Sequence, residues 1–171
     1  MMMQMLAAGG LPVLTDDRRP PDENNPRGYY EYEPVKALAG NVEWLAHTRG
    51  KAVKIVSALL CHLPEGFDHR VIFMRRPMEE VLASQRTMLA RLGHKASPED
   101  DARLGRLFAR HLTEVDELLR RRPSVELLDV DYSQAVDTPR RVAERVNAFL
   151  GGGLDTARMA AAVAPDLHRQ R

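Results

Sequence analysis

Short apolar runs alternate along this chain with segments whose apolar residues recur at helical spacing. The segment 34–48 shows the pattern, with intervals of three, four and three residues between Val35, Leu38, Val42 and Leu45. This is the period of one face of a helix. In this way helices are predicted at 1–8, 34–48, 77–92, 98–122, 139–150 and 154–163. The apolar runs at 11–14, 51–57, 70–74 and 125–130 are predicted to be strands, with a turn or short helix at 58–63.

The order of these elements predicts an α/β fold. Strands that alternate with helices form a parallel sheet covered on both faces, and near-continuous apolar runs are typical of strands buried on both sides. We expect one domain over 1–171, because the sequence contains no internal repeat and no long linker. Cap signals support two helix starts, since Ser97 is followed three residues later by Asp100, and Thr138 directly precedes the helix at 139–150.

Composition narrows the classes of function. The formal net charge is +1 and aromatic residues make up 5% of the chain, so neither charge nor stacking surfaces indicate nucleic-acid binding. No apolar run approaches the roughly 20 residues needed to cross a bilayer, and the apolar opening lacks the basic segment of a secretory signal. The single cysteine, Cys61, excludes an internal disulfide and fits a reducing compartment. We therefore expect a cytoplasmic protein in which Cys61 is a small buried residue.

The segment 70–88 has the pattern of an anion-binding site. An apolar strand ends in Arg75 and Arg76, a proline then opens a helix, and Ser84 follows Arg76 by eight residues. In open α/β sheets ligands bind at the carboxyl ends of strands, where the start of the next helix favours negative charge. Arg76 would add a fork of donors and Ser84 a hydroxyl, whereas strand alternation points Arg75 to the other side. The alternative is a surface arginine and a serine that bonds its own helix.

The nine residues from Arg76, R-P-M-E-E-V-L-A-S, resemble the 3′-phosphate-binding motif of sulfotransferases that use 3′-phosphoadenosine 5′-phosphosulfate (PAPS). Other segments are similar to bacterial members of that family in the same order, namely MQMLAAGGLPV, NPRGYYEYEPV, GKAVKIVS, VELLDVDY and AFLGG. The resemblance covers nearly the whole chain. It implies a three-layer α/β/α fold of the P-loop nucleoside triphosphate hydrolase type, and transfer of a sulfuryl group from PAPS to an acceptor hydroxyl or amine. It also implies that Arg76 and Ser84 bind the 3′-phosphate, that Glu80 occupies a position that is often acidic, and that the chemistry needs no metal.

Sulfuryl transfer requires a base for the acceptor's proton and cations for the charge that develops on the leaving phosphate. Glu31 in GYYEYEP is the first candidate base, because several sulfotransferases use a glutamate in this region; the alternative is a glutamate that complements a helix dipole. His62 in CHLP is a second candidate, which resembles the histidine of animal cytosolic members but precedes Arg76 by only 14 residues. Lys54 either stabilises the transferring group or extends outward from a sheet edge. Residues 25–32 are expected to border the acceptor, a small molecule, glycan or peptide.

One departure from the family concerns the N-terminus. Sulfotransferases begin with a strand and a phosphate loop, whereas this sequence begins with the predicted helix and contains no G-x-x-x-x-G-K-[ST] motif. We expect in-frame coding sequence upstream of Met1 to encode a strand and a Gly/Ser/Thr-rich loop; the alternative is a natural remnant. Two other functions stay open, namely a catalytically inactive binding or interaction module and a kinase-like enzyme that shares the fold.

Overall fold

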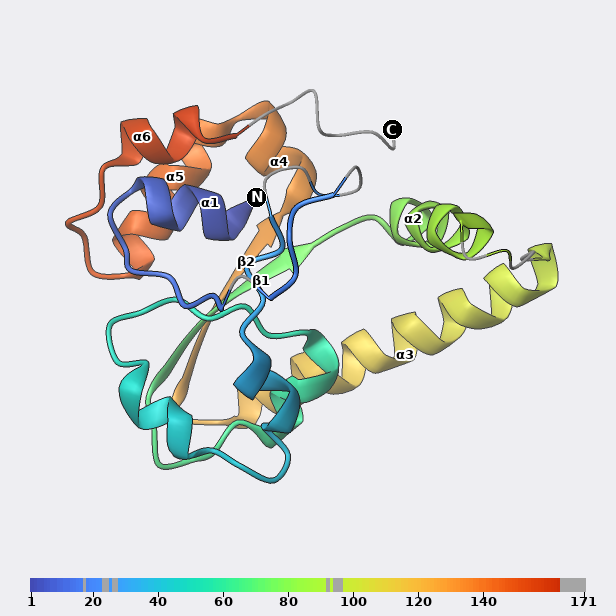
Figure 1. Cartoon of the computed structure of the whole chain (residues 1–171), viewed down its shortest axis with the longest axis horizontal. Coiled ribbons are helices and arrows are strands. Elements are labelled where there is room, and N and C mark those ends of the chain that lie inside the picture. Colours follow the sequence, from blue (N-terminus) through green and yellow to red (C-terminus); the bar gives the residue numbers. More distant parts are fainter. Residues whose placement is uncertain (17, 23–24, 26–27, 92, 94–96, 164–171) are drawn as a thin grey trace.

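The computed structural model describes residues 1–16, 18–22, 25, 28–91, 93 and 97–163 (Figure 1). The elements of this part follow in chain order, with 3₁₀ helices labelled η: α1 (Met2–Ala8), η1 (Glu33–Ala37), η2 (Glu43–His47), η3 (Ser57–His62), β1 (His69–Arg75), α2 (Met78–Arg91), α3 (Pro98–Arg121), β2 (Val125–Asp131), α4 (Tyr132–Asp137), α5 (Pro139–Phe149) and α6 (Thr156–Ala161). Helices combined with parallel strands confirm the α/β class predicted from the sequence.

The sheet of the described residues consists of β1 and β2, which run parallel. Their register pairs His69 with Val125 at one end and Arg75 with Asp131 at the other. Both strands therefore finish at the same edge, where α2 and α4 begin. The sheet is smaller than expected, because only two of the predicted strands are formed.

The other two predicted strands, at 11–14 and 51–57, are reduced to a single parallel bridge between Val13 and Ala52. The Ala52 N–H donates to the Pro12 carbonyl at 2.8 Å, and the pairing does not extend into a ladder. The prediction of strands was wrong here. The physical reason is the lack of a second neighbour, since residues 51–55 have backbone partners on one side only and a strand is stabilised by its ladders.

Apolar side chains alternate between the two faces of the sheet and enter two separate cores. Ile72 belongs to the first core, whereas Val71 and Phe73 belong to the second. Figure 1 shows α1, α5 and α6 together on the first side, and the 3₁₀ helices with the long α3 on the other. The buried residues of the first core include Met5, Val130, Val142, Val146 and Met159. Those of the second core include Leu38, Trp44, Leu60, Val115 and Leu119.

The helix predicted at 34–48 is divided into η1 and η2. The N–H groups of Gly40 and Asn41 both bond the Ala37 carbonyl, at 2.9 and 2.8 Å, which closes η1 and turns the chain. Glycine in the interior of a helical pattern costs about 1 kcal/mol relative to alanine, and this break decides against one continuous helix. As a result Val42, expected on the buried face, is exposed.

Of the two predicted caps, one is formed. The Ser97 hydroxyl accepts from the Asp100 N–H at 3.1 Å, and the Asp100 carboxylate accepts from the Ser97 N–H at 3.2 Å, so α3 begins with a capping box. The Thr138 hydroxyl instead donates to the Gln134 carbonyl at 2.9 Å. Thr138 therefore closes α4, a short helix that the sequence pattern did not predict, rather than capping α5.

Candidate functional site

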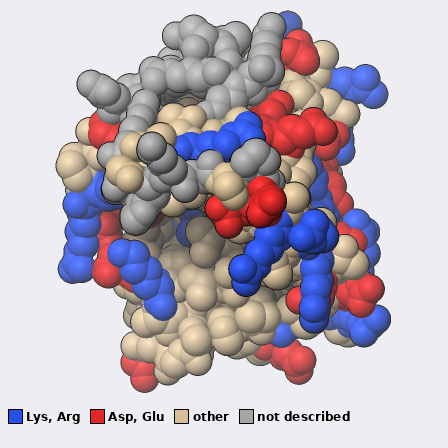
Figure 2. Space-filling view, turned by 90° about the vertical axis from the view of Figure 1, so that its right-hand side faces the viewer, with Lys and Arg blue, Asp and Glu red and all other residues tan. Residues whose placement is uncertain are grey.

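A large groove separates residues 51–55 from β1, and we refer to it as the central groove. Every residue of β1 lines one wall, residues 51–55 line the other, and residues 1–3 complete the lining beside them. The groove has a volume of about 1190 Å³. Figure 2 shows the surface hollowed in the middle of one face, with Lys and Arg side chains beside the hollow and uncharged residues below it.

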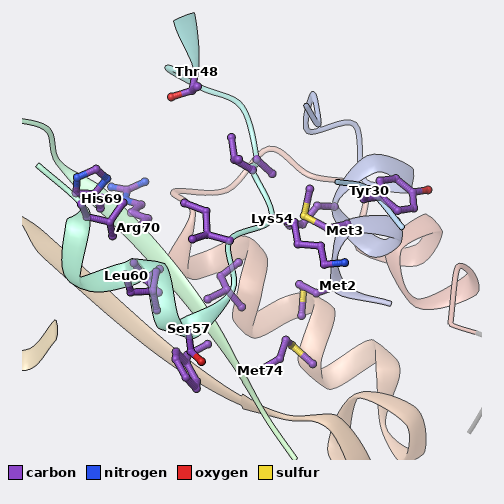
Figure 3. Close-up of a pocket in the computed structure, with 18 of the residues that line it drawn as sticks. Met2, Met3, Tyr30, Thr48, Lys54, Ser57, Leu60, His69, Arg70 and Met74 are labelled. Atoms are coloured by element: carbon purple, nitrogen blue, oxygen red, sulfur yellow. The ribbon is translucent and has the colours of Figure 1, made fainter. Parts of the chain in front are cut away.

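The two ends of the groove are lined by different residues. His69 and Arg70, the first residues of β1, lie at one end in Figure 3, whereas Met2 and Met74 lie toward the other. The second end holds the groove-lining residues that follow β1 and β2. Because ligands in open α/β folds bind at the carboxyl ends of parallel strands, this second end is the candidate site.

Arg76 leaves the carboxyl end of β1 and lines the central groove. Its Nε donates to Glu80 Oε2 at 2.9 Å, and its guanidinium carbon lies 4.5 Å from the ring centroid of Tyr132, the residue that follows β2. In the described part of the chain Arg76 makes no other hydrogen bond. Its two terminal nitrogens are therefore donors that an anion can use.

Ser84 lies on α2, one turn beyond Glu80 and on the same helix face. The residue is half-buried and lies outside the lining of the central groove. Its hydroxyl makes no hydrogen bond among the described residues, in contrast to Thr87, whose hydroxyl donates to the Ala83 carbonyl at 3.0 Å. Glu80 and Ser84 thus follow one another along α2, Arg76 lies two residues before the first residue of that helix, and of the three only Arg76 lines the groove.

Arg75 points away from Arg76, as strand alternation predicts. Its Nη2 donates to Asp116 of α3 and its Nε to Asp129 of β2, both at 2.6 Å. Hydrogen bonds from Arg120 and from Arg75 hold the pKa of Asp116 below its ordinary value, against the opposing effect of partial burial. Arg75 is committed to this ion-pair network and has a structural role.

Lys54 lines the central groove from the wall opposite β1 and does not extend outward (Figure 3). Its Nζ donates to the Tyr29 carbonyl at 2.8 Å. Burial lowers the pKa of Lys54 from its ordinary value, nearby Glu31 opposes this shift, and nearby Arg19 adds to it. Lys54 is thus a partly desolvated cation inside the groove.

Glu31 belongs to a polar loop beside the groove and lies outside the groove lining. Its Oε1 accepts from Arg19 Nη1 at 3.0 Å, and the Arg19 guanidinium carbon lies 3.4 Å from the Tyr29 ring centroid. The Tyr29 hydroxyl in turn donates to the Asp22 carboxylate at 2.7 Å. Burial raises the pKa of Tyr29, and the hydrogen bond to Asp22 adds to this effect.

His62 is the last residue of η3, is exposed, and does not line the central groove. It therefore lies apart from the candidate site. Cys61 is also exposed, which contradicts the prediction of a buried cysteine. The period of three residues in a 3₁₀ helix turns Leu60 and Leu63 into the core and leaves the two residues between them outside.

Three groove residues escaped the sequence analysis. Ser57 Oγ lies 3.0 Å from His111 Nε2, and both line the groove together with Tyr132. Ser57 and Tyr132 each stand at the end of an apolar run, so the rule that identified Arg76 would have found them. His111, in the interior of α3, gives no such signal.

Among the residues that the structure describes, no helix is long and apolar enough to cross a membrane. In the same residues no group of three or more His, Cys, Asp or Glu side chains lies close enough together to hold a metal ion. Comparisons of the chain with known protein families, with curated proteins and with solved structures find no match.

Proposed function

We propose that this protein is a PAPS-dependent sulfotransferase in which Arg76 binds the 3′-phosphate of the co-substrate. The main support is the position of Arg76 at the carboxyl end of β1, beside the groove, with two terminal nitrogens that have no other partner in the described residues. Arginine presents donors in a planar fork that matches a phosphate. The resemblance of 76–84 to the family motif supports the same assignment.

Ser84 would complete the phosphate site from α2. Glu80 lies between the two residues, one turn before Ser84, and its carboxylate orients Arg76 through Nε. A phosphate held by the terminal nitrogens of Arg76 could reach the Ser84 hydroxyl along the same helix face. The wider fold that we infer is the three-layer P-loop type, which agrees with helices on both faces of a parallel sheet.

The proposed chemistry forms a bond between the acceptor oxygen or nitrogen and sulfur. The bond from sulfur to the bridging phosphate oxygen breaks, and 3′-phosphoadenosine 5′-phosphate (PAP) leaves with that electron pair. Lys54, a cation in the groove, is suited to stabilise the charge that develops during transfer. Glu31 is the proposed base for the acceptor's proton and belongs to the loop around Lys54. The exposed His62 is the less favoured alternative.

Isothermal titration calorimetry with PAP tests the proposal. We expect Arg76→Ala to weaken PAP binding by about 10- to 100-fold, because hydrogen bonds to charged groups contribute about 1.5–3 kcal/mol. Ser84→Ala should weaken it by about 10-fold, the lower end of the range for one hydrogen bond to a charged group. The matched control is Arg110→Ala, since Arg110 also bonds a glutamate four residues later but lies on the exposed face of α3. This control should bind PAP with unchanged affinity.

Two results would contradict the proposal and favour another function. Nucleoside triphosphate binding in preference to PAP would indicate the kinase-like enzyme. Binding of neither ligand would indicate the inactive module. Equal PAP affinity of Arg76→Ala and Arg110→Ala would remove Arg76 from the phosphate site.

A further inference from the structure

Ser57 and His111 meet where η3 packs against α3. Ser57 Oγ lies 3.0 Å from His111 Nε2, both residues are half-buried, and both line the central groove. They are 54 positions apart in the sequence, so the fold brings them together. We refer to this pair as the dyad. Its separation falls in the range of about 2.6–3.2 Å that is typical of a nucleophile and its general base.

The Ser57 hydroxyl is placed by the turn from an extended segment into a helix (Figure 3). Val56 is still extended, with φ −76° and ψ 145°, and Ser57 is the first residue of η3. A serine between an extended segment and a helical turn presents its Oγ at the end of that segment, as the nucleophile of α/β hydrolases does. The sequence contains no G-x-S-x-G motif, but a nucleophile and its base are recognised by their geometry and roles.

Neither member of the dyad has another polar partner among the described residues. The hydroxyls of Thr48, Thr87 and Thr138 donate to backbone carbonyls of the preceding turn, at 2.7, 3.0 and 2.9 Å. A hydroxyl used in this way stabilises or bends a helix. Ser57 Oγ instead bonds the imidazole, and the described part of the chain gives the ring no second hydrogen bond and no ion pair. The dyad is therefore available for chemistry.

The groove lining next to His111 is apolar. Phe108 and Leu112, three residues before His111 and one residue after it, line the groove from α3. Met78 and Val81 line it from α2, which packs against α3. All four are half-buried, so each keeps apolar surface that a ligand can cover. A few polar groups in an apolar lining are typical of a small-molecule site, and this lining suits an apolar acyl chain.

We infer that Ser57 is a nucleophile activated by His111, and that the dyad hydrolyses esters with an apolar acyl chain. Ser57 Oγ forms a bond to the carbonyl carbon of the ester and gives its proton to His111 Nε2. The bond from that carbon to the ester oxygen breaks, and the alcohol leaves with the electron pair and the proton from His111. Water then attacks the acyl-serine, His111 again accepts and returns the proton, and the carboxylic acid is released.

This activity goes beyond the proposed sulfuryl transfer and does not depend on it, because it uses neither Arg76 nor a phosphate. Ester turnover should be slow, since no carboxylate of the described residues bonds the second ring nitrogen of His111. Loss of the function of such a carboxylate costs a serine protease about 10⁴-fold in kcat. Covalent labelling of Ser57 is therefore the sharper measurement, because it requires one attack and no turnover.

The test incubates the 171-residue protein with an alkyl fluorophosphonate, without PAPS or PAP, and locates the label by peptide mass spectrometry. Ser57 Oγ bonds to phosphorus and fluoride leaves. A general base contributes about 10²- to 10⁴-fold, so Ser57 should be labelled at least about 100-fold faster than Ser124. Ser124 is the matched control, because it lines the same groove and its hydroxyl bonds no histidine among the described residues.

Variants identify the base. His111→Gln should slow labelling of Ser57 by at least about 100-fold, whereas Ser124→Ala should leave it unchanged. Imidazole added to His111→Ala should restore part of the rate, which a purely structural role of the histidine would not allow. Hydrolysis of p-nitrophenyl octanoate above the rate in buffer should be lost in Ser57→Ala and kept in Ser124→Ala.

The site of labelling in the wild-type protein decides the inference even where a variant fails to fold. Equal labelling of Ser57, Ser84 and Ser124, or no label on Ser57, would overturn it. An unchanged labelling rate in His111→Gln with the melting temperature of the wild type would remove His111 as the base. A labelled Ser57 without release of acid from the ester would contradict the proposed hydrolysis. PAP affinity is measured separately, so failure of this activity and failure of the proposed function are distinguishable.

Discussion

Removal of the Arg75 side chain should destabilise the fold by more than removal of the side chain of its neighbour Arg76. Arg75 makes two hydrogen bonds of 2.6 Å, to Asp116 and to Asp129, and its side chain is 27% exposed. A charge-assisted hydrogen bond contributes about 1.5–3 kcal/mol when well shielded. Partial exposure reduces this value, and Arg120 still pairs with both carboxylates. We therefore expect Arg75→Ala to cost about 1.5–2.5 kcal/mol in total.

Arg76 makes one ion pair, with Glu80 four residues later, and stacks on Tyr132. A helical pair of this spacing contributes about 0.3–0.5 kcal/mol, and a cation–π contact that is partly exposed about 0.5–1 kcal/mol. Arg76→Ala should thus cost about 0.8–1.5 kcal/mol. Because the two costs differ by about 1 kcal/mol, the two variants should differ in melting temperature by roughly 2–4 °C for a domain of this size.

Urea unfolding of wild type, Arg75→Ala, Arg76→Ala and the exposed control Arg110→Ala measures these differences. The pH dependence adds a second check, because the pKa of Asp116 lies below its ordinary value of 3.8. The stabilisation from this carboxylate is complete above pH 3.8 and is lost as the pH falls through the lowered folded-state pKa. The difference in the free energy of unfolding between wild type and Arg75→Ala should therefore decrease as the pH falls below 3.8. Equal losses for Arg75→Ala and Arg76→Ala, or a gap independent of pH, would refute the reasoning.

Further substitutions test the packing and the groove. Gly9→Ala would place a Cβ 2.6 Å from Cγ of the fully buried Met159. It should therefore lower the free energy of unfolding by about 1–3 kcal/mol, measured by thermal unfolding. The control Gly40→Ala, with open space around its Cβ, should not be destabilising. Burial lowers the pKa of Lys54 in the folded state below its ordinary value of 10.5. Between the folded-state and unfolded-state pKa the unfolded state binds more protons at this site, so the free energy of unfolding rises with pH over that range. Lys54→Met should remove this rise in urea unfolding measured between pH 8 and 10.5.

The elements that could be predicted from the sequence are those whose own residues supply most of their stabilisation. α3 has a capping box at Ser97, 24 residues of helical pattern and basic residues in its last turn. β1 and β2 are apolar runs that pair with each other and pack on both faces. In these segments local pattern and tertiary packing agree, which is the condition for a reliable prediction from one sequence.

The segments that could not be predicted depend on neighbours or on single residues. Residues 51–55 have the apolar character of a strand but a backbone partner on one side only. Their pattern therefore predicts a strand that the described residues do not form. Thr138 precedes a proline as a cap would, yet its hydroxyl bonds the preceding helix, because α4 fills the gap after β2. The residues of the candidate site differ in the same way. Arg76 could be predicted because it directly follows a strand, whereas His111 lies in the interior of α3, where no sequence pattern distinguishes it.

Arg75 and Arg76 make different contacts because of their positions at the end of β1. Arg75 is still paired in the ladder with Asp131, so the alternation of the strand fixes its direction toward α3 and its side chain is held by two carboxylates. Arg76 lies one residue beyond the ladder, where alternation ends and the chain turns into α2. There a single glutamate holds one nitrogen and leaves the terminal donors toward the groove. Within two residues, the strand end thus separates a cation held in an ion-pair network from one whose terminal donors lie beside the groove, so the ligand of the proposed site can change without loss of the sheet.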